Sequence, residues 1–235
     1  MKPVRLRLDY FWVAESGLTA LLVVTLAYTF FTCALSHFRF GALIGHLLFS
    51  LIIITGVSVT FKQLWLRFLV IVLALASLSL IWLQHIYRHV WVLTMLSALS
   101  GLVFLVMLLA VLIVQVFRRG AVTPHRIRGA IVVYLLLGGL WALFYFIVAL
   151  FMPQAFHWPE GMLADDVRAV QQILTYFSFT TLTTTGFGDV TPAIPLTRTL
   201  AMFEALAGQL YLVITLARLV SQAVWSPDPQ GDKEE

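Results

Sequence analysis

The sequence predicts an all-α integral membrane protein with six transmembrane helices. Of its 235 residues, 61% are hydrophobic and only 11% are charged, and the mean hydropathy is +0.96. A water-soluble fold of this composition would have too little polar surface. A helix needs about 20 apolar residues to cross about 30 Å of hydrocarbon, and the chain contains six stretches of about that length. Each stretch is continuous rather than alternating, which favours helices over a β-barrel.

The six stretches lie near residues 12–35, 41–60, 66–85, 90–117, 127–152 and 195–224. Basic residues precede the first stretch, as in a signal peptide, but the stretch is too long and lacks a clear cleavage site, so we expect a retained span. A Gly-Ala-Val-Thr-Pro run at 120–124 breaks the helical pattern. We therefore expect a four-span N-terminal membrane domain over 1–119 and a second membrane domain over 120–224. Residues 225–235 are expected to form a short disordered cytosolic tail, because they are few and polar.

The basic residues predict the orientation in the membrane. With both termini in the cytoplasm, eleven lysines and arginines fall on the inner side and four on the outer side, as the positive-inside rule requires. We expect a multi-pass protein of a cell membrane, either a plasma membrane or a bacterial inner membrane. The basic residues set orientation, so nucleic-acid binding is not expected. The single cysteine, Cys33, excludes an intrachain disulfide and is expected to pack.

The segment between the last two stretches carries the most informative motif. Residues 183–189 read Thr-Thr-Thr-Gly-Phe-Gly-Asp and follow a run rich in aromatic and hydroxyl side chains. Backbone carbonyls that all face one axis can replace the hydration shell of a cation. They require backbone dihedrals of alternating sign, which Gly186 and Gly188 tolerate. Asp165 and Asp166 predict the start of a short re-entrant pore helix ending near Leu182, followed by an extended filter.

Residues 125–224 resemble the pore module of the potassium channels through the motif at 184–189. The resemblance implies a selectivity filter in which carbonyls of Thr184, Thr185, Gly186 and Phe187 line the ion sites, with Gly188 completing the filter. The Thr184 hydroxyl would form the innermost ring, and Asp189 would stand at the outer mouth. Phe187 replaces the more common tyrosine. Thr185 replaces the usual valine, and its side chain is expected to point away from the pore.

Other residues of the same region are expected to support or line the pore. Glu204 is an acid well inside a span, where an ionisable side chain is costly. We expect it to brace the filter by hydrogen bonds to the pore helix, for example through threonine hydroxyls, with Thr180 as a further support. The alternative is a neutral glutamate with a structural role alone. Gly208 fits either an inner-helix hinge, as the resemblance implies, or close helix packing. Helical spacing places Gln209, Leu212, Leu216 and Val220 along one stripe of the last span, and the resemblance implies that this stripe lines the pore rather than packs in a core.

The first four spans do not read as a voltage sensor. The fourth stretch contains no arginine or lysine, and the chain has no acid between Glu15 and Glu160, whereas a sensor needs both. His85 and His89 have helical i, i+4 spacing that suits zinc binding or external pH sensing, but two ligands do not make a closed site. We therefore expect interfacial histidines and no metal site beyond potassium in the filter.

Together these observations predict a passive, voltage-independent, potassium-selective channel. One chain supplies one pore loop, so a homotetramer is expected, and potassium ions and membrane lipid are the expected partners. No catalytic residues and no cofactors are expected, so the protein is not predicted to be an enzyme. Two alternatives remain open. One is a non-selective cation channel of the same build, and the other is a non-conducting scaffold or regulatory subunit.

Overall fold

The computed structural model describes residues 5–34, 41–59, 64–87, 90–117, 123–159 and 166–224. Seven helices and two short strands occur in this part of the chain: α1 (Arg5–Ala34), α2 (Gly41–Val59), α3 (Leu64–Ile86), α4 (Trp91–Val116), α5 (Pro124–Phe151), η1 (Pro153–Ala155), β1 (Phe156–His157), α6 (Val167–Leu182), β2 (Thr191–Pro192) and α7 (Pro195–Val224), where η1 is a single 3-10 turn. Residues 120–122 of the predicted break at 120–124, and the predicted tail at 225–235, lie outside the described residues.

The predominantly helical fold is confirmed. Four helices are long and apolar enough to cross a membrane, within α3, α4, α5 and α7, and α1 and α2 contribute shorter apolar stretches among the described residues. The helix that begins at Arg5 starts earlier than the apolar stretch predicted near residue 12. Apolar length marks the part of a helix that suits the membrane, whereas backbone hydrogen bonds continue the helix into polar residues.

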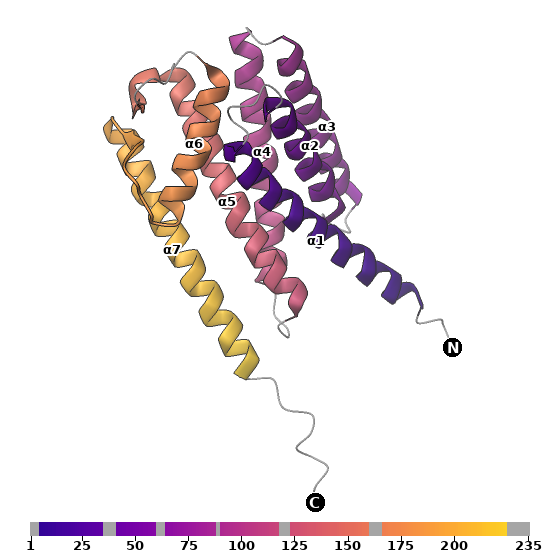
Figure 1. The fold of residues 1–235 in the computed structure, drawn as a ribbon. Coiled ribbons are helices and arrows are strands. Elements are labelled where there is room, and N and C mark those ends of the chain that lie inside the picture. Colours follow the sequence, from indigo (N-terminus) through magenta and orange to yellow (C-terminus); the bar gives the residue numbers. More distant parts are fainter. Residues whose placement is uncertain are drawn as a thin grey trace, which may run out of the picture.

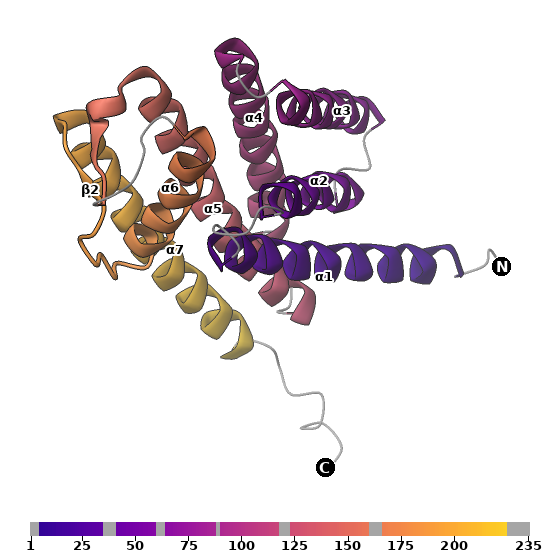
Figure 2. The same cartoon turned by 45° about the horizontal axis from the view of Figure 1, so that its top comes forward.

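Helix α5 lies at the centre of the arrangement, with α1–α4 on one side and α6 and α7 on the other (Figures 1 and 2). α5 packs against α4 and α1 on the first side and against α6 and α7 on the second. A hydrogen bond from the Arg128 guanidinium to the Thr19 hydroxyl, 3.0 Å long, joins α5 to α1. α5 thus joins the two groups of helices, and α1 also packs directly against α6.

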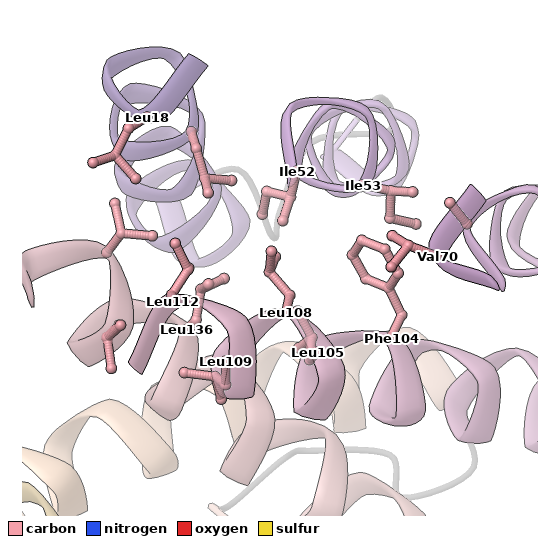
Figure 3. Packing of buried hydrophobic residues seen from close by; sticks show 14 of the residues in the cluster. Leu18, Ile52, Ile53, Val70, Phe104, Leu105, Leu108, Leu109, Leu112 and Leu136 are labelled. Carbon is pink, nitrogen blue, oxygen red and sulfur yellow. The ribbon is translucent and has the colours of Figure 1, made fainter. Parts of the chain in front are cut away.

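An apolar core joins the first five helices (Figure 3). Leu18 from α1, Ile52 and Ile53 from α2, Phe104 from α4 and Leu136 from α5 are all buried in it. Tight side-chain packing of this kind holds membrane helices together, because lipid offers little hydrophobic driving force.

A second core fixes α6 against α5. Tyr145 of α5, Phe156 of β1 and Phe177 of α6 contact one another with ring centroids 5.2 to 5.7 Å apart. Strands β1 and β2 form an antiparallel pair that the sequence did not predict, with Phe156 opposite Pro192 and His157 opposite Thr191. This pair ties the segment that leaves α5 to the segment that enters α7, on either side of the predicted filter.

Candidate functional site

Helix α6 is short and capped where the sequence predicted. Asp166 takes an extended N-cap conformation, and its Oδ1 accepts a hydrogen bond of 3.0 Å from the backbone N–H of Arg168. The cap satisfies one of the amide groups that a helix start leaves without a partner. Asp165, the second predicted cap residue, lies outside the described residues. α6 ends at Leu182, directly before the motif.

The backbone of the motif alternates in φ. Thr184, Gly186 and Gly188 have φ values of +58°, +53° and +81°, and no other described residue has a positive φ. The two glycines thus adopt the left-handed conformation that the sequence analysis expected of them, and their place in an ion filter stays a prediction. Thr184 was not anticipated, because a β-branched residue rarely adopts this conformation. Alternation of this kind turns successive carbonyls toward one side of the chain, as a carbonyl-lined ion path requires.

Backbone hydrogen bonds anchor the motif to the last turn of α6. The Thr180 carbonyl accepts from the N–H groups of Thr185 at 2.8 Å and Gly186 at 3.2 Å, and the Thr181 carbonyl accepts from Thr184 at 2.9 Å. The Thr180 hydroxyl donates to the Phe177 carbonyl within α6. Thr180 thus holds the filter segment through its carbonyl rather than its side chain.

The side chains of the motif have local partners. The Thr185 and Thr183 hydroxyls are 2.9 Å apart, and the Thr183 hydroxyl donates to the Phe179 carbonyl at 2.7 Å. Thr185 stands where the resemblance leads one to expect valine, and its hydroxyl is thus hydrogen-bonded. The Phe187 ring lies nearly parallel to that of Tyr176, with centroids 6.4 Å apart, and it is 70% exposed. Residues 183–189 are all exposed in the single chain.

The segment after the motif is held by a carbonyl that sequence reasoning missed. The Asp189 carboxylate accepts a hydrogen bond from the Val190 N–H at 3.1 Å. Further along, the Ala155 carbonyl accepts from the Ala193 N–H and from the buried Thr197 hydroxyl, both at 2.9 Å. Nothing in the sequence signalled these two hydrogen bonds. They join positions about 40 residues apart, and the acceptor is a backbone carbonyl that any residue type carries.

Glu204 lies at the centre of a buried hydrogen-bond network. Its Oε1 accepts from the Ser178 hydroxyl of α6 at 2.5 Å, and its Oε2 accepts from the Tyr145 hydroxyl of α5 at 2.7 Å. Ser178 also lies 2.8 Å from the Gly138 carbonyl. Glu204 and Tyr145 are 0% exposed. The network joins α5, α6 and α7, with serine and tyrosine as donors instead of threonines.

Sequence reasoning missed Ser178 and Tyr145 as partners of Glu204. A signal for Tyr145 was present, because a buried tyrosine hydroxyl usually requires a hydrogen-bond partner. Ser178 carried no comparable signal, since a serine in an apolar helix can bond to its own backbone.

Gly208 lies where α7 meets the end of α6. A Cβ added at Gly208 would come within 2.3 Å of the Leu182 carbonyl oxygen, to which the Tyr134 hydroxyl donates at 3.3 Å. The absent side chain therefore allows direct contact between α7 and the residue that ends α6. This geometry supports the close-packing interpretation, and the hinge remains a prediction.

The predicted pore-lining residues lie on an exposed helix. Gln209, Leu212, Leu216 and Val220 are exposed, but other apolar residues around α7 are exposed as well, including Phe203, Leu206, Leu210 and Val213. Exposure in one chain therefore does not separate a pore-facing stripe from other faces. It does show that α7 has far more apolar surface than its own chain covers.

Near the ends of the N-terminal helices lie one contact with α7 and one of the two predicted histidines. The Arg218 guanidinium of α7 donates to the carbonyl of Phe117, which follows α4, and lies 5.0 Å from the Phe117 ring centroid. His85 packs edge-on against His46 of α2, with centroids 5.2 Å apart. His89, the other histidine of the predicted pair, lies outside the described residues. Among the described residues, no group of three or more potential metal ligands is found.

One comparison with known proteins gives a match. A family model described as "Ion channel" matches residues 173–224, which comprise most of α6, the motif and α7. This match supports an ion channel of the pore-loop type and a membrane-embedded transport protein rather than an enzyme. It does not extend to α1–α5. No curated protein and no solved structure matches the chain.

Proposed function

We propose that the protein is a passive, voltage-independent potassium channel whose pore forms on the axis of a homotetramer. The observation that carries this proposal is the alternation of positive φ at Thr184, Gly186 and Gly188 directly after a capped helix. Such a backbone presents a series of carbonyl oxygens, the ligand type that potassium filters use. The filter would comprise residues 184–188, with Asp189 at its outer mouth.

The tetramer is supported by what the single chain leaves exposed. Residues 183–189 and most of the apolar surface of α7 have no cover within the chain. Irregular backbone at membrane depth is stable only when protein buries it or when it lines a water-filled path. Four copies around one axis would supply both conditions, and the last turn of each α6 would direct its negative end toward the ion.

The sequence supports the remaining features of the proposal. The excess of basic residues between spans supports an orientation with both termini in the cytoplasm and the filter mouth outside. We propose six spans in a plasma or bacterial inner membrane, with a four-span domain over 1–119 and the pore domain over 120–224. The absence of arginine and lysine from α4 supports a four-span domain that does not respond to voltage.

Potassium flux into liposomes that contain the purified protein tests the proposal. We expect uptake that external barium blocks. Gly186→Ala should abolish uptake, because a Cβ at φ +53° costs roughly 1–2 kcal/mol in each chain. Gly139→Ala is the matched control, because its added Cβ meets only Leu105, at 3.9 Å. Correctly assembled protein without uptake would instead support a non-conducting scaffold.

A further inference from the structure

A cavity of about 80 Å³ lies where α1–α4 meet α5 and the beginning of α6. Its apolar wall includes Phe49, Ile81 and Phe146. The polar lining comes from the end of α1, the beginning of α2, the end of α3 and the beginning of α6, which are all at one end of the helix bundle (Figure 1). A single water needs only about 10–15 Å³ by this kind of measure, so a small polar group fits.

The polar lining favours an anion. Arg168 contributes a guanidinium, and Gln171 and Gln172 follow it on the first turns of α6. No carboxylate occurs among the described residues that line the cavity. Asp166 accepts a hydrogen bond from the backbone N–H of Arg168 and is not part of the lining. An arginine beside a helix N-terminus forms a strong pair with planar or tetrahedral oxyanions.

Thr32 provides an independent observation. It lines the cavity, is 8% exposed, and its buried hydroxyl has no hydrogen-bond partner among the residues that the structure describes. Thr25 and Thr29 of the same helix donate to the carbonyls four residues earlier, at 2.6 and 2.9 Å. A buried hydroxyl without a partner is costly. Because Thr32 lines the cavity, its hydroxyl is a candidate donor to a group that enters the cavity.

A neighbouring amide is fixed by its own partners. The Gln84 Oε1 accepts from the Ser97 hydroxyl, and its Nε2 lies 3.5 Å from the Thr94 hydroxyl. These contacts fix the orientation of the Gln84 amide and occupy its oxygen and one N–H. An amide nitrogen carries two N–H groups, so the second is the one that could donate to a group in the cavity. Gln84 and Ser97 both line the cavity. The lining thus combines one cationic side chain with hydrogen-bond donors from two other helices, α1 and α3.

We propose that this cavity binds a phosphate-class oxyanion, held by Arg168 and by the donors of Thr32 and Gln84. The apolar wall and the position at one end of membrane-spanning helices suit the phosphate of an anionic lipid, and a free phosphate ion has the same chemistry. A bound anion would join the four-helix domain to α6, the helix that carries the filter. Its effect on conduction rests on the proposed function, whereas its binding does not.

Thermal unfolding of the purified full-length protein in detergent tests binding without requiring a conducting pore. The probes are phosphatidylglycerol, phosphatidylcholine at the same mole fraction, and inorganic phosphate against chloride at matched ionic strength. We expect Tm to rise with phosphatidylglycerol or with phosphate and to rise less with phosphatidylcholine. A response to phosphatidylglycerol alone identifies a lipid headgroup, and a response to phosphate as well identifies a free anion as a second source.

Variants identify the cavity as the site. Arg168→Gln should weaken binding about tenfold or more, because it removes charge-assisted hydrogen bonds. Thr32→Val should raise the Tm of the unliganded protein, by removing a buried hydroxyl without a partner, and should reduce the ligand-induced rise. Arg198→Gln and Thr29→Val are the matched controls outside this lining and should keep the full response.

Three results would overturn the proposal: no rise in Tm with either anion, an equal rise with phosphatidylcholine, or a full response in both Arg168→Gln and Thr32→Val. If Arg168→Gln fails to fold, Thr32→Val alone decides the matter, because its predicted signature requires a folded and more stable protein.

Discussion

The contact between Gly208 and Leu182 predicts the effect of a single methyl group. In Gly208→Ala the new Cβ would begin 2.3 Å from the Leu182 carbonyl oxygen, and it must move beyond 3.0 Å. The atom in its path is backbone, so no side-chain rotation relieves the clash, and α7 must shift away from α6. Overpacking of this kind typically costs about 1–3 kcal/mol.

The substitution also has a favourable effect. Alanine inside a helix is about 1 kcal/mol more favourable than glycine. Because the clash involves a backbone atom, we take the upper part of the overpacking range and expect a net loss of about 1–2 kcal/mol per chain. A loss of about 1 kcal/mol lowers Tm by about 2–4 °C for a chain of this size. If Gly208 served only as a hinge, Gly208→Ala would raise Tm instead, since alanine would stiffen and stabilise the helix.

Thermal unfolding monitored by tryptophan fluorescence shows whether the substitution lowers or raises Tm, and potassium flux in liposomes shows its effect on conduction. Gly139→Ala is the control, because it gains the same helix propensity with its nearest contact at 3.9 Å. We expect Gly208→Ala to unfold at a lower temperature and to carry less flux than Gly139→Ala. An equal or higher Tm with unchanged flux would refute the packing argument.

Two further predictions concern the buried acid and the response to voltage. Glu204→Gln should keep most of the stability and flux, because an amide can accept from Tyr145 and donate to Ser178. Glu204→Val should cost about 1–3 kcal/mol per chain, because the buried Tyr145 hydroxyl loses its acceptor; equal Tm and flux for the valine variant and the parent would contradict this role. Single-channel open probability in planar bilayers should change little with voltage, since one gating charge moved through 100 mV supplies only about 2.3 kcal/mol and α4 carries none. A steep voltage dependence without added blockers would overturn that expectation.

The helices were predictable from the sequence because the membrane requires apolar segments of a fixed length. The last stretch, predicted at 195–224, coincides with α7 (Pro195–Val224). Polar helix ends were less predictable, as the early start of α1 shows. The β1–β2 pair gave no signal, because two-residue strands have no detectable alternation and their partners are distant in sequence.

The candidate site was predictable where glycine reports backbone geometry. The glycines at 186 and 188 indicated a positive φ at those two positions. Thr184 also has a positive φ, which a threonine rarely adopts. The hydrogen bond from its N–H to the Thr181 carbonyl, together with those of Thr185 and Gly186, holds the segment in this conformation. Glu204 stood out in the sequence because an acidic side chain inside an apolar membrane helix is energetically costly. Its partners on α5 and α6 lie 59 and 26 residues away, and only the packing of three helices brings them together.

The most direct test of the potassium-selective filter is the reversal potential of current through the purified protein in a planar bilayer, with potassium on one side and sodium on the other. A ladder of carbonyls at 184–187 should make the current reverse near the potassium equilibrium potential, with sodium carrying little current. The measurement needs no knowledge of the gating stimulus beyond a protein that opens. Reversal near zero, with equal permeability to potassium and sodium, would contradict the proposed function and identify a non-selective cation channel.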